Sequence, residues 1–308
     1  MGPAERKPLL DRWMSRSSAS EDERMDRAER MVKAAIDAHP AFDGYRSSIK
    51  VYAKGSYANQ TNVRADSDVD VVVENRDLYY YRYNPTSSAP APDPNASPYT
   101  GRWDDKAEWR TEVTKALINA FGATQVDTSG KVALTIAEVP GSRPSADVVP
   151  SFEFRRFDAA DRSVVHHGSR VFSTDGKAID NFPAQQKSNG VEKDRVTSGR
   201  YKKYVRALKS AENYLAENGI ISDLPSYFME CLVSNVPNHA ITTGYSVDDG
   251  FRATLAHLLT NLIPDNFDKN EWREPNGLKW LFADDSKWTR DDGLLLCWRT
   301  WEHLGYQS

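Results

Sequence analysis

Cysteine is almost missing from this chain. Cys231 and Cys297 are its two cysteines among 308 residues, and both stand in apolar stretches with helical spacing. We expect buried free thiols and no disulfide, which fits an intracellular protein. Two distant cysteines also cannot complete a four-ligand zinc site, because the adjacent His166-His167 pair would point its rings to opposite faces. We therefore expect no zinc.

Long apolar runs and an excess of basic residues are missing too. No run of about 18 apolar residues occurs, and the N-terminus lacks a signal-peptide core, so we expect a soluble, cytoplasmic protein without membrane segments. The net charge of −4 argues against a surface built to coat nucleic acid, although a local basic groove stays open. The composition is globular, with 39% hydrophobic and 27% charged residues, and the length suits one large or two modest domains.

Hydrophobic periodicity divides the chain near residue 195 into a mixed part, 1–195, and a helical part, 196–308. We expect helices over 21–38, 104–121, 200–217, 225–236, 248–262 and 291–303, and strands over 48–53, 67–74, 131–139, 145–149, 152–157 and 164–172. Residues 175–199 look like a polar loop. Residues 77–100 hold five tyrosines and five prolines, which predicts no regular element. Such an insertion is either functional or a plain surface loop, and both alternatives stay open.

Two carboxylates, Asp68 and Asp70, stand at spacing two in a run of valines, some twelve residues after Gly55-Ser56. On a strand this spacing points both carboxylates to one face and Val69, Val71 and Val73 to the other. Two anions side by side repel each other unless a cation lies between them. Mg²⁺ held by carboxylates and completed by substrate phosphates is the usual arrangement, and it is the layout of a nucleotidyltransferase metal site.

Three other interpretations of this stretch were weighed. A solvated strand end is the alternative for the pair taken alone. A calcium loop is excluded, because Val71 stands where glycine is needed and Asp77 stands where a bidentate glutamate is needed. A P-loop is excluded, because Gly55 does not begin a GxxxxGK[ST] pattern.

A third carboxylate, Asp147, lies in a short apolar strand between Pro144 and Pro150. A charge in such a strand is costly unless it is paired or binds a metal; the alternative is an aspartate that caps a turn. If this strand lies beside 67–74, Asp147 joins Asp68 and Asp70 around two Mg²⁺ ions roughly 3.5–4 Å apart. Asp147 would then also help to take the proton of the attacking hydroxyl.

The expected helix 200–217 carries a basic face made by Lys202, Arg206 and Lys209. A solvated face is the plain interpretation of such a pattern. The alternative is that these side chains line a cleft and hold a triphosphate, where lysine acts as a point charge on phosphate.

On these residues the chain resembles the cGAS/DncV-like nucleotidyltransferases of bacterial antiphage systems, over most of residues 20–262, and shares its wider architecture with oligoadenylate synthases and poly(A) polymerases. The motifs that carry the resemblance are Gly55-Ser56, Asp68 with Asp70, Asp147, Lys209 and Ser226-Tyr227. Phe182-Pro183 and Pro225 favour the branch that makes cyclic oligonucleotides.

The resemblance implies an α+β fold: a mixed-sheet, polymerase-beta-like core facing a C-terminal helical domain, with the active site in the cleft between them. It implies that Ser56 and the Gly55-Ser56 backbone hold the terminal phosphates of the donor nucleotide. It further implies that Lys209 and Ser226 contact the donor triphosphate and that Tyr227 stacks on the donor base. The cofactor would be two Mg²⁺ ions, with Mn²⁺ as the alternative metal.

The activity implied is the joining of nucleoside triphosphates into a cyclic di- or trinucleotide that activates an effector protein of a defence operon. Animal relatives that sense DNA carry a zinc-binding insertion, which this chain lacks, so we expect no activation by DNA; constitutive activity or control by a separate protein fits better. Two alternatives remain: a nucleotidyltransferase acting on an RNA 3′ end, a protein or a small molecule, and a binding protein without catalysis.

Overall fold

The computed structural model describes residues 1–16, 20–63, 68–84, 103, 105–159 and 161–306. These residues form two compact units. The sheet unit contains the described residues of 20–58 and 68–184, and the helical unit contains 1–16, 59–63 and 185–306. The predicted division was 1–195 and 196–308; the helical unit as observed also takes in three segments of the first part, 1–16, 59–63 and 185–195.

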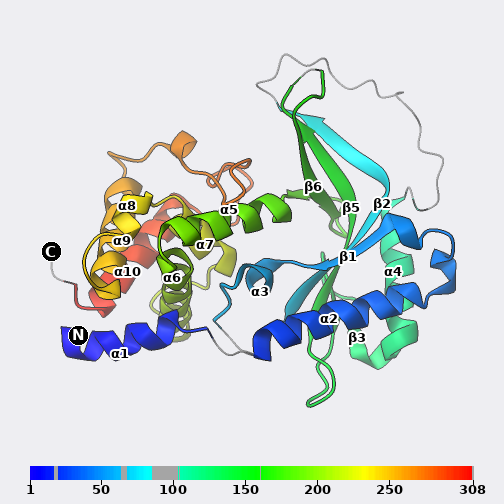
Figure 1. Ribbon diagram of the computed structural model, residues 1–308, viewed down its shortest axis with the longest axis horizontal. Coiled ribbons are helices and arrows are strands. Elements are labelled where there is room, and N and C mark those ends of the chain that lie inside the picture. Colours follow the sequence, from blue (N-terminus) through cyan, green and yellow to red (C-terminus); the bar gives the residue numbers. More distant parts are fainter. Residues whose placement is uncertain (17–19, 64–67, 85–102, 104, 160, 307–308) are drawn as a thin grey trace. The chain divides into compact units, whose positions relative to one another are not determined.

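The sheet unit is built on a mixed seven-stranded sheet, as predicted (Figure 1). Its strands are β1 (Ile49–Ala53), β2 (Val69–Tyr83), β3 (Val126–Asp127), β4 (Leu134–Ile136), β5 (Ala146–Phe157), β6 (Val165–Phe172) and β7 (Ala178–Asn181). The order is β1-β2-β5-β4-β3, with β6 paired to β5 and β7 paired to β6. β2 and β5 run parallel, and the other pairs are antiparallel.

Two helices, α2 (Ser20–Asp37) and α4 (Lys106–Phe121), pack their apolar stripes on one face of this sheet. α4 begins at Asp105, whose carboxylate accepts the backbone N–H groups of Ala107 and Glu108. The core on this face joins Val32 of α2 and Trp109 of α4 to the buried valines of β2. The opposite face of β2 and β5 carries Asp70 and Asp147, together with the buried Val72 and Val149.

The two strands predicted over 145–149 and 152–157 are a single strand, β5, which runs through Pro150. Proline lacks the N–H that a sheet ladder needs, which is why a break was expected. β4 pairs with β5 as far as Val148, and β6 begins its pairing at Phe152. Pro150 therefore lies in the gap between two neighbouring strands, where the missing donor costs little.

Two segments predicted to be irregular are regular. Residues 77–83 continue β2, because tyrosines favour an extended strand and the first proline comes only at position 85; residues 85–100 of that predicted loop lie outside the described residues. Residues 178–181 form β7, and most of the remaining predicted loop is the helix α5 (Pro183–Val196). α5 has no fully buried side chain, so it shows no apolar stripe in the sequence.

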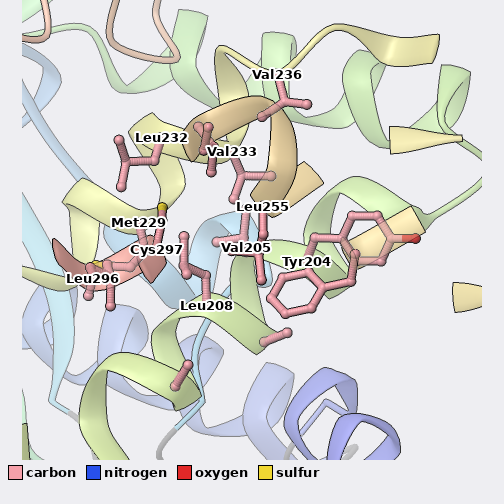
Figure 2. Packing of buried hydrophobic residues seen from close by; sticks show 14 of the residues in the cluster. Tyr204, Val205, Leu208, Met229, Leu232, Val233, Val236, Leu255, Leu296 and Cys297 are labelled. Atoms are coloured by element: carbon pink, nitrogen blue, oxygen red, sulfur yellow. The ribbon is translucent and has the colours of Figure 1, made fainter. Parts of the chain in front are cut away.

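The helical unit consists of α1 (Pro3–Met14), most of α5, α6 (Arg200–Glu217), α7 (Ser226–Ser234), α8 (Asn238–Ile241), α9 (Val247–Leu262) and α10 (Arg290–His303). Short 3₁₀ turns occur at Pro40–Phe42, Arg46–Ser48, Ala123–Gln125 and Lys269–Glu271. The six predicted helices are confirmed, with ends within two residues of those expected. Figure 2 shows the core of this unit, where Leu208 of α6 and Leu232 of α7 pack with Leu255 and Cys297.

Both cysteines are free and buried, as predicted. Within the described part of the chain, no helix combines the length and apolarity needed to cross a bilayer.

Candidate active site

Asp70 and Asp147 lie side by side on neighbouring strands. β2 and β5 are parallel, and their register pairs Asp70 directly with Asp147 and Val69 with Ala146. Asp68 comes one residue before β2 and is exposed. Because Val69 is fully buried on the opposite face, the period of two places the aspartates on the face away from the core.

The Asp147 carboxylate is held by its surroundings. The hydroxyl of Thr135 on β4 donates to its Oδ1 atom at 2.6 Å. Burial raises the pKa of Asp147 and the negative charge of Asp68 raises it further, whereas the Thr135 bond and the Lys54 ammonium lower it. Accumulated negative charge at this place favours binding of a cation.

Lys54 belongs to this site, and the sequence analysis missed it. Its backbone N–H donates to the carbonyl of Asp70 at 2.9 Å. Burial lowers the pKa of the Lys54 ammonium, while the charges of Asp70 and Asp147 act to raise it. The local sequence gives no signal for this role, because a lysine after an apolar strand is usually solvated; the antiparallel pairing of β1 with β2 is what brings Lys54 to the acids.

Gly55 occupies a position that a larger residue could not fill. It begins the short helix α3 (Gly55–Asn59), where a plain turn was expected, with a φ of +73°. A Cβ atom at this position would lie 2.1 Å from Oδ2 of Asp70. The glycine therefore lets the backbone approach the carboxylate, and the half-buried Ser56 follows it directly.

The remaining predicted residues belong to the helical unit. Ser226 is exposed at the start of α7, and Tyr227 next to it donates its hydroxyl proton to Glu274 at 3.2 Å. Lys209 is only 2% exposed, and its ammonium donates to the Thr61 hydroxyl at 3.2 Å. The structure thus gathers the three acids with Gly55 and Ser56 in one unit, places Ser226 beside Tyr227 in the other, and buries Lys209.

The donor chemistry of the three acids fits a hard divalent cation, since carboxylate oxygens are the ligands of Mg²⁺. Asp70 is in register with Asp147, and Asp68 lies near enough to raise the pKa of Asp147. Among the described residues, no three His, Cys, Asp or Glu side chains stand close enough together to enclose a metal ion. The metal and the number of ions therefore stay predictions.

Comparison with known proteins gives consistent matches along the chain. The model of the cGAS/DncV-like nucleotidyltransferase C-terminal helical domain matches residues 188–305. A cyclic dipurine nucleotide synthase from Elizabethkingia meningoseptica is 35% identical over 97% of this chain and 98% of its own length. A cyclic dipyrimidine nucleotide synthase, CdnE, from Legionella pneumophila is 32% identical over 93% of this chain and 95% of its own.

A solved structure gives the same result for the fold. The structure of Rhodothermus marinus CdnE c-UMP-AMP synthase with Apcpp and Upnpp superposes with a TM-score of 0.80 at 25% identity, covering 100% of this chain and 98% of that one. The fold agrees with these matches, since the chain has a mixed sheet with two parallel acidic strands and a separate helical unit. The relatives match this chain over nearly its whole length. The chain belongs to the cGAS/DncV-like nucleotidyltransferases and is an enzyme of that family.

Proposed function

We propose that this enzyme joins two nucleoside triphosphates into a cyclic dinucleotide and releases pyrophosphate, with a cyclic trinucleotide as the alternative product. The observation that carries the proposal is the register of β2 and β5, which sets Asp70 beside Asp147 on neighbouring strands. The relatives named above as cyclic dinucleotide synthases support it, since they match this chain over nearly its whole length.

In this proposal Asp68, Asp70 and Asp147 hold Mg²⁺, or Mn²⁺ in its place. The bound metal would neutralise phosphate charge and make the attacking hydroxyl more acidic. Thr135 donates to Oδ1 of Asp147, which orients this carboxylate, and Asp147 would help to accept the proton of the attacking hydroxyl.

The backbone at Gly55 and the hydroxyl of Ser56 would hold the terminal phosphates of the donor. Ser226, exposed at the start of α7, would contact the same triphosphate. The resemblance assigns Lys209 to this triphosphate too, but its 2% exposure and its hydrogen bond to Thr61 favour a different role. The ring of Tyr227 would stack on the donor base; its hydroxyl is already held by Glu274, which restricts the ring orientation.

The bases used are left open by the comparisons. The relatives are named for dipurine, dipyrimidine and UMP-AMP products, so base choice changes within the family at this level of identity. We propose that the product serves as a second messenger in antiphage defence and acts on a separate effector protein.

Product formation from nucleotides alone tests the proposal. Incubation with the four labelled nucleoside triphosphates and Mg²⁺, without any acceptor, should give a small product that resists phosphatase, identified by mass spectrometry. Adding EDTA, or replacing Asp68 and Asp70 together by alanine, should lower the rate at least about 1,000-fold, because the site would lose its cation. Circular dichroism should show that the double variant keeps its fold.

Two outcomes would contradict this assignment. Folded wild-type enzyme that consumes nucleotides only when an RNA, protein or small-molecule acceptor is added would favour the alternative class of nucleotidyltransferase. Full activity of the Asp68→Ala, Asp70→Ala variant would show that these carboxylates do not hold the metal.

A further inference from the structure

Glu230 on α7 is a buried acid that the proposed chemistry does not use. Only 3% of its surface is exposed. Its Oε1 atom accepts from Gln186 Nε2 at 2.8 Å and from Asn59 Nδ2 at 3.3 Å, and its Oε2 atom accepts from the Thr61 hydroxyl at 3.1 Å. A buried carboxylate is tolerated when several donors converge on it in this way.

The polar chain continues from Thr61 to Lys209. The Lys209 ammonium donates to Thr61 Oγ1, whose own proton goes to Glu230, so the positive and negative charges are linked through one hydroxyl. Thr61 is 1% exposed, which means that it is fixed inside the unit and does not contact solvent.

A second cation, the guanidinium of Arg206, holds Gln60, the residue between Asn59 and Thr61. Arg206 on α6 donates from NH1 to the carbonyl of Gln60 at 2.8 Å and from Nε to the carbonyl of Met14 at 2.8 Å. Gln60 has a φ of +58°, a conformation that non-glycine residues adopt only when their surroundings impose it. Side chains of α6 and α7 therefore restrain three consecutive residues, 59–61.

This restrained segment has a particular place in the chain. It begins with Asn59, the last residue of α3, and α3 itself begins with Gly55 and Ser56. The segment is therefore joined through one short helix to residues of the proposed active site.

We propose that Glu230, with Thr61 and Lys209, is a positioning network that fixes residues 59–61 and thereby the C-terminal end of α3, the short helix that begins with Gly55 and Ser56. The network acts on catalysis through the backbone and does not touch the substrate. The inference rests on the proposed function where it predicts a change in kcat. Its prediction for the backbone mobility of residues 55–63 does not depend on that function. It gives the buried Lys209 a role different from direct contact with the triphosphate.

Thr61→Val is the sharpest variant, because it keeps the shape of the side chain and removes the hydroxyl that links Lys209 to Glu230. Glu230→Gln is the second variant, and Glu271→Gln, an exposed glutamate of the same unit, is the control. In full-length protein, hydrogen exchange over residues 55–63 should become at least about tenfold faster in the two network variants and stay unchanged in the control.

Steady-state kinetics supply the catalytic readout. Both network variants should lose about tenfold or more in kcat while KM for the nucleotides changes less than twofold, since misplacement of a site affects the chemical step. Lys209→Met should behave in the same way; a rise in KM with unchanged kcat would instead assign Lys209 to the triphosphate and overturn its place in the network.

The two proposals fail in different ways. Exchange rates of residues 55–63 within twofold of wild type in folded Thr61→Val and Glu230→Gln would overturn the positioning network, whatever the enzyme makes. If wild-type enzyme gives no nucleotide product while exchange responds as expected, the proposed function fails and the holding of the segment stands. A lower melting temperature with unchanged kcat would reduce the network to a structural role.

Discussion

Gly55 lies against the carboxylate of Asp70 in the proposed site, and the Cβ atom that glycine lacks would overlap with that carboxylate. A positive φ at Gly55 and the 2.1 Å separation of a built Cβ from Asp70 Oδ2 are independent reasons for glycine at this position. Gly141 shares the same φ of +73°, but a Cβ there meets nothing within 4 Å. Substitutions at Gly55 and Gly141 therefore distinguish two effects: both strain the backbone, but only the one at Gly55 displaces the Asp70 carboxylate.

We predict that Gly55→Ala lowers activity at least about 100-fold, because Asp70 must move to make room. Gly141→Ala should cost only the strain of the left-handed backbone, about 1 kcal/mol, and keep its activity. Initial rates and thermal unfolding of the two purified variants provide the measurement. Equal losses of activity would show that the close approach to Asp70 is unimportant.

At this scale the acids could be predicted from sequence and Lys54 could not. A carboxylate inside an apolar strand, such as Asp147, stands out because its burial needs a reason. A lysine at the end of a strand is usually solvated. Only the pairing of β1 with β2 brings Lys54 to Asp70, and that pairing is not visible in the local pattern.

Among the helices, those with an apolar stripe could be predicted from the sequence, and those without one could not. α6 was placed correctly from Tyr201 to Leu215 because its buried residues recur at helical spacing. α5 was missed because its contacts are made by polar side chains. Lys193 of α5 shows this: its ammonium donates to the carbonyl of Val236 at 2.8 Å and to Asn238 Oδ1 at 3.2 Å.

The Lys193 contact predicts a pH dependence of stability. Burial lowers the pKa of Lys193 to about 8, against 10.5 for an ordinary lysine. Between these values the unfolded chain binds more protons than the folded one, so this group adds stability as pH rises through the window. The slope cannot exceed about 1.4 kcal/mol per pH unit.

The melting temperature of wild type relative to Lys193→Gln, followed from pH 7.5 to 10, measures this contribution. We expect the difference to move in favour of wild type above pH 8. Parallel curves across the range would mean that Lys193 titrates like a solvated lysine.

For the whole molecule, the notable feature is that the helical unit is assembled from distant parts of the sequence. Arg6 of α1 contacts both carboxylate oxygens of Asp248 at 2.9 Å and donates to the carbonyl of Leu304 at 3.0 Å. Its guanidinium also lies 4.5 Å from the ring centre of Tyr306. A contact between residues 242 positions apart leaves no pattern in the local sequence. For this reason the division predicted from the sequence lay at a single point of the chain.

We predict that Arg6→Met destabilises the protein by about 3 kcal/mol, because Asp248 would keep its charge without its partner. Lys7→Met, one residue away, should cost less than about 1 kcal/mol, since the exposed Lys7–Asp11 pair is weak. Thermal or urea unfolding of the two variants measures the difference. Adding Asp248→Asn to Arg6→Met should recover part of the loss; no recovery would point to lost packing instead of the unpaired charge.

The position of Glu230 has a consequence for how the chain is made. Thr61 leaves the ribosome 169 residues before the carboxylate that will accept its proton. At about 5–20 residues per second, roughly 10 to 30 s pass between the two. During that interval Thr61 lacks its Glu230 partner, while the sheet strands between them are already being synthesised. The hydrogen bond from Thr61 to Glu230 can therefore form only after α7 has been synthesised, when all seven described strands of the sheet already exist.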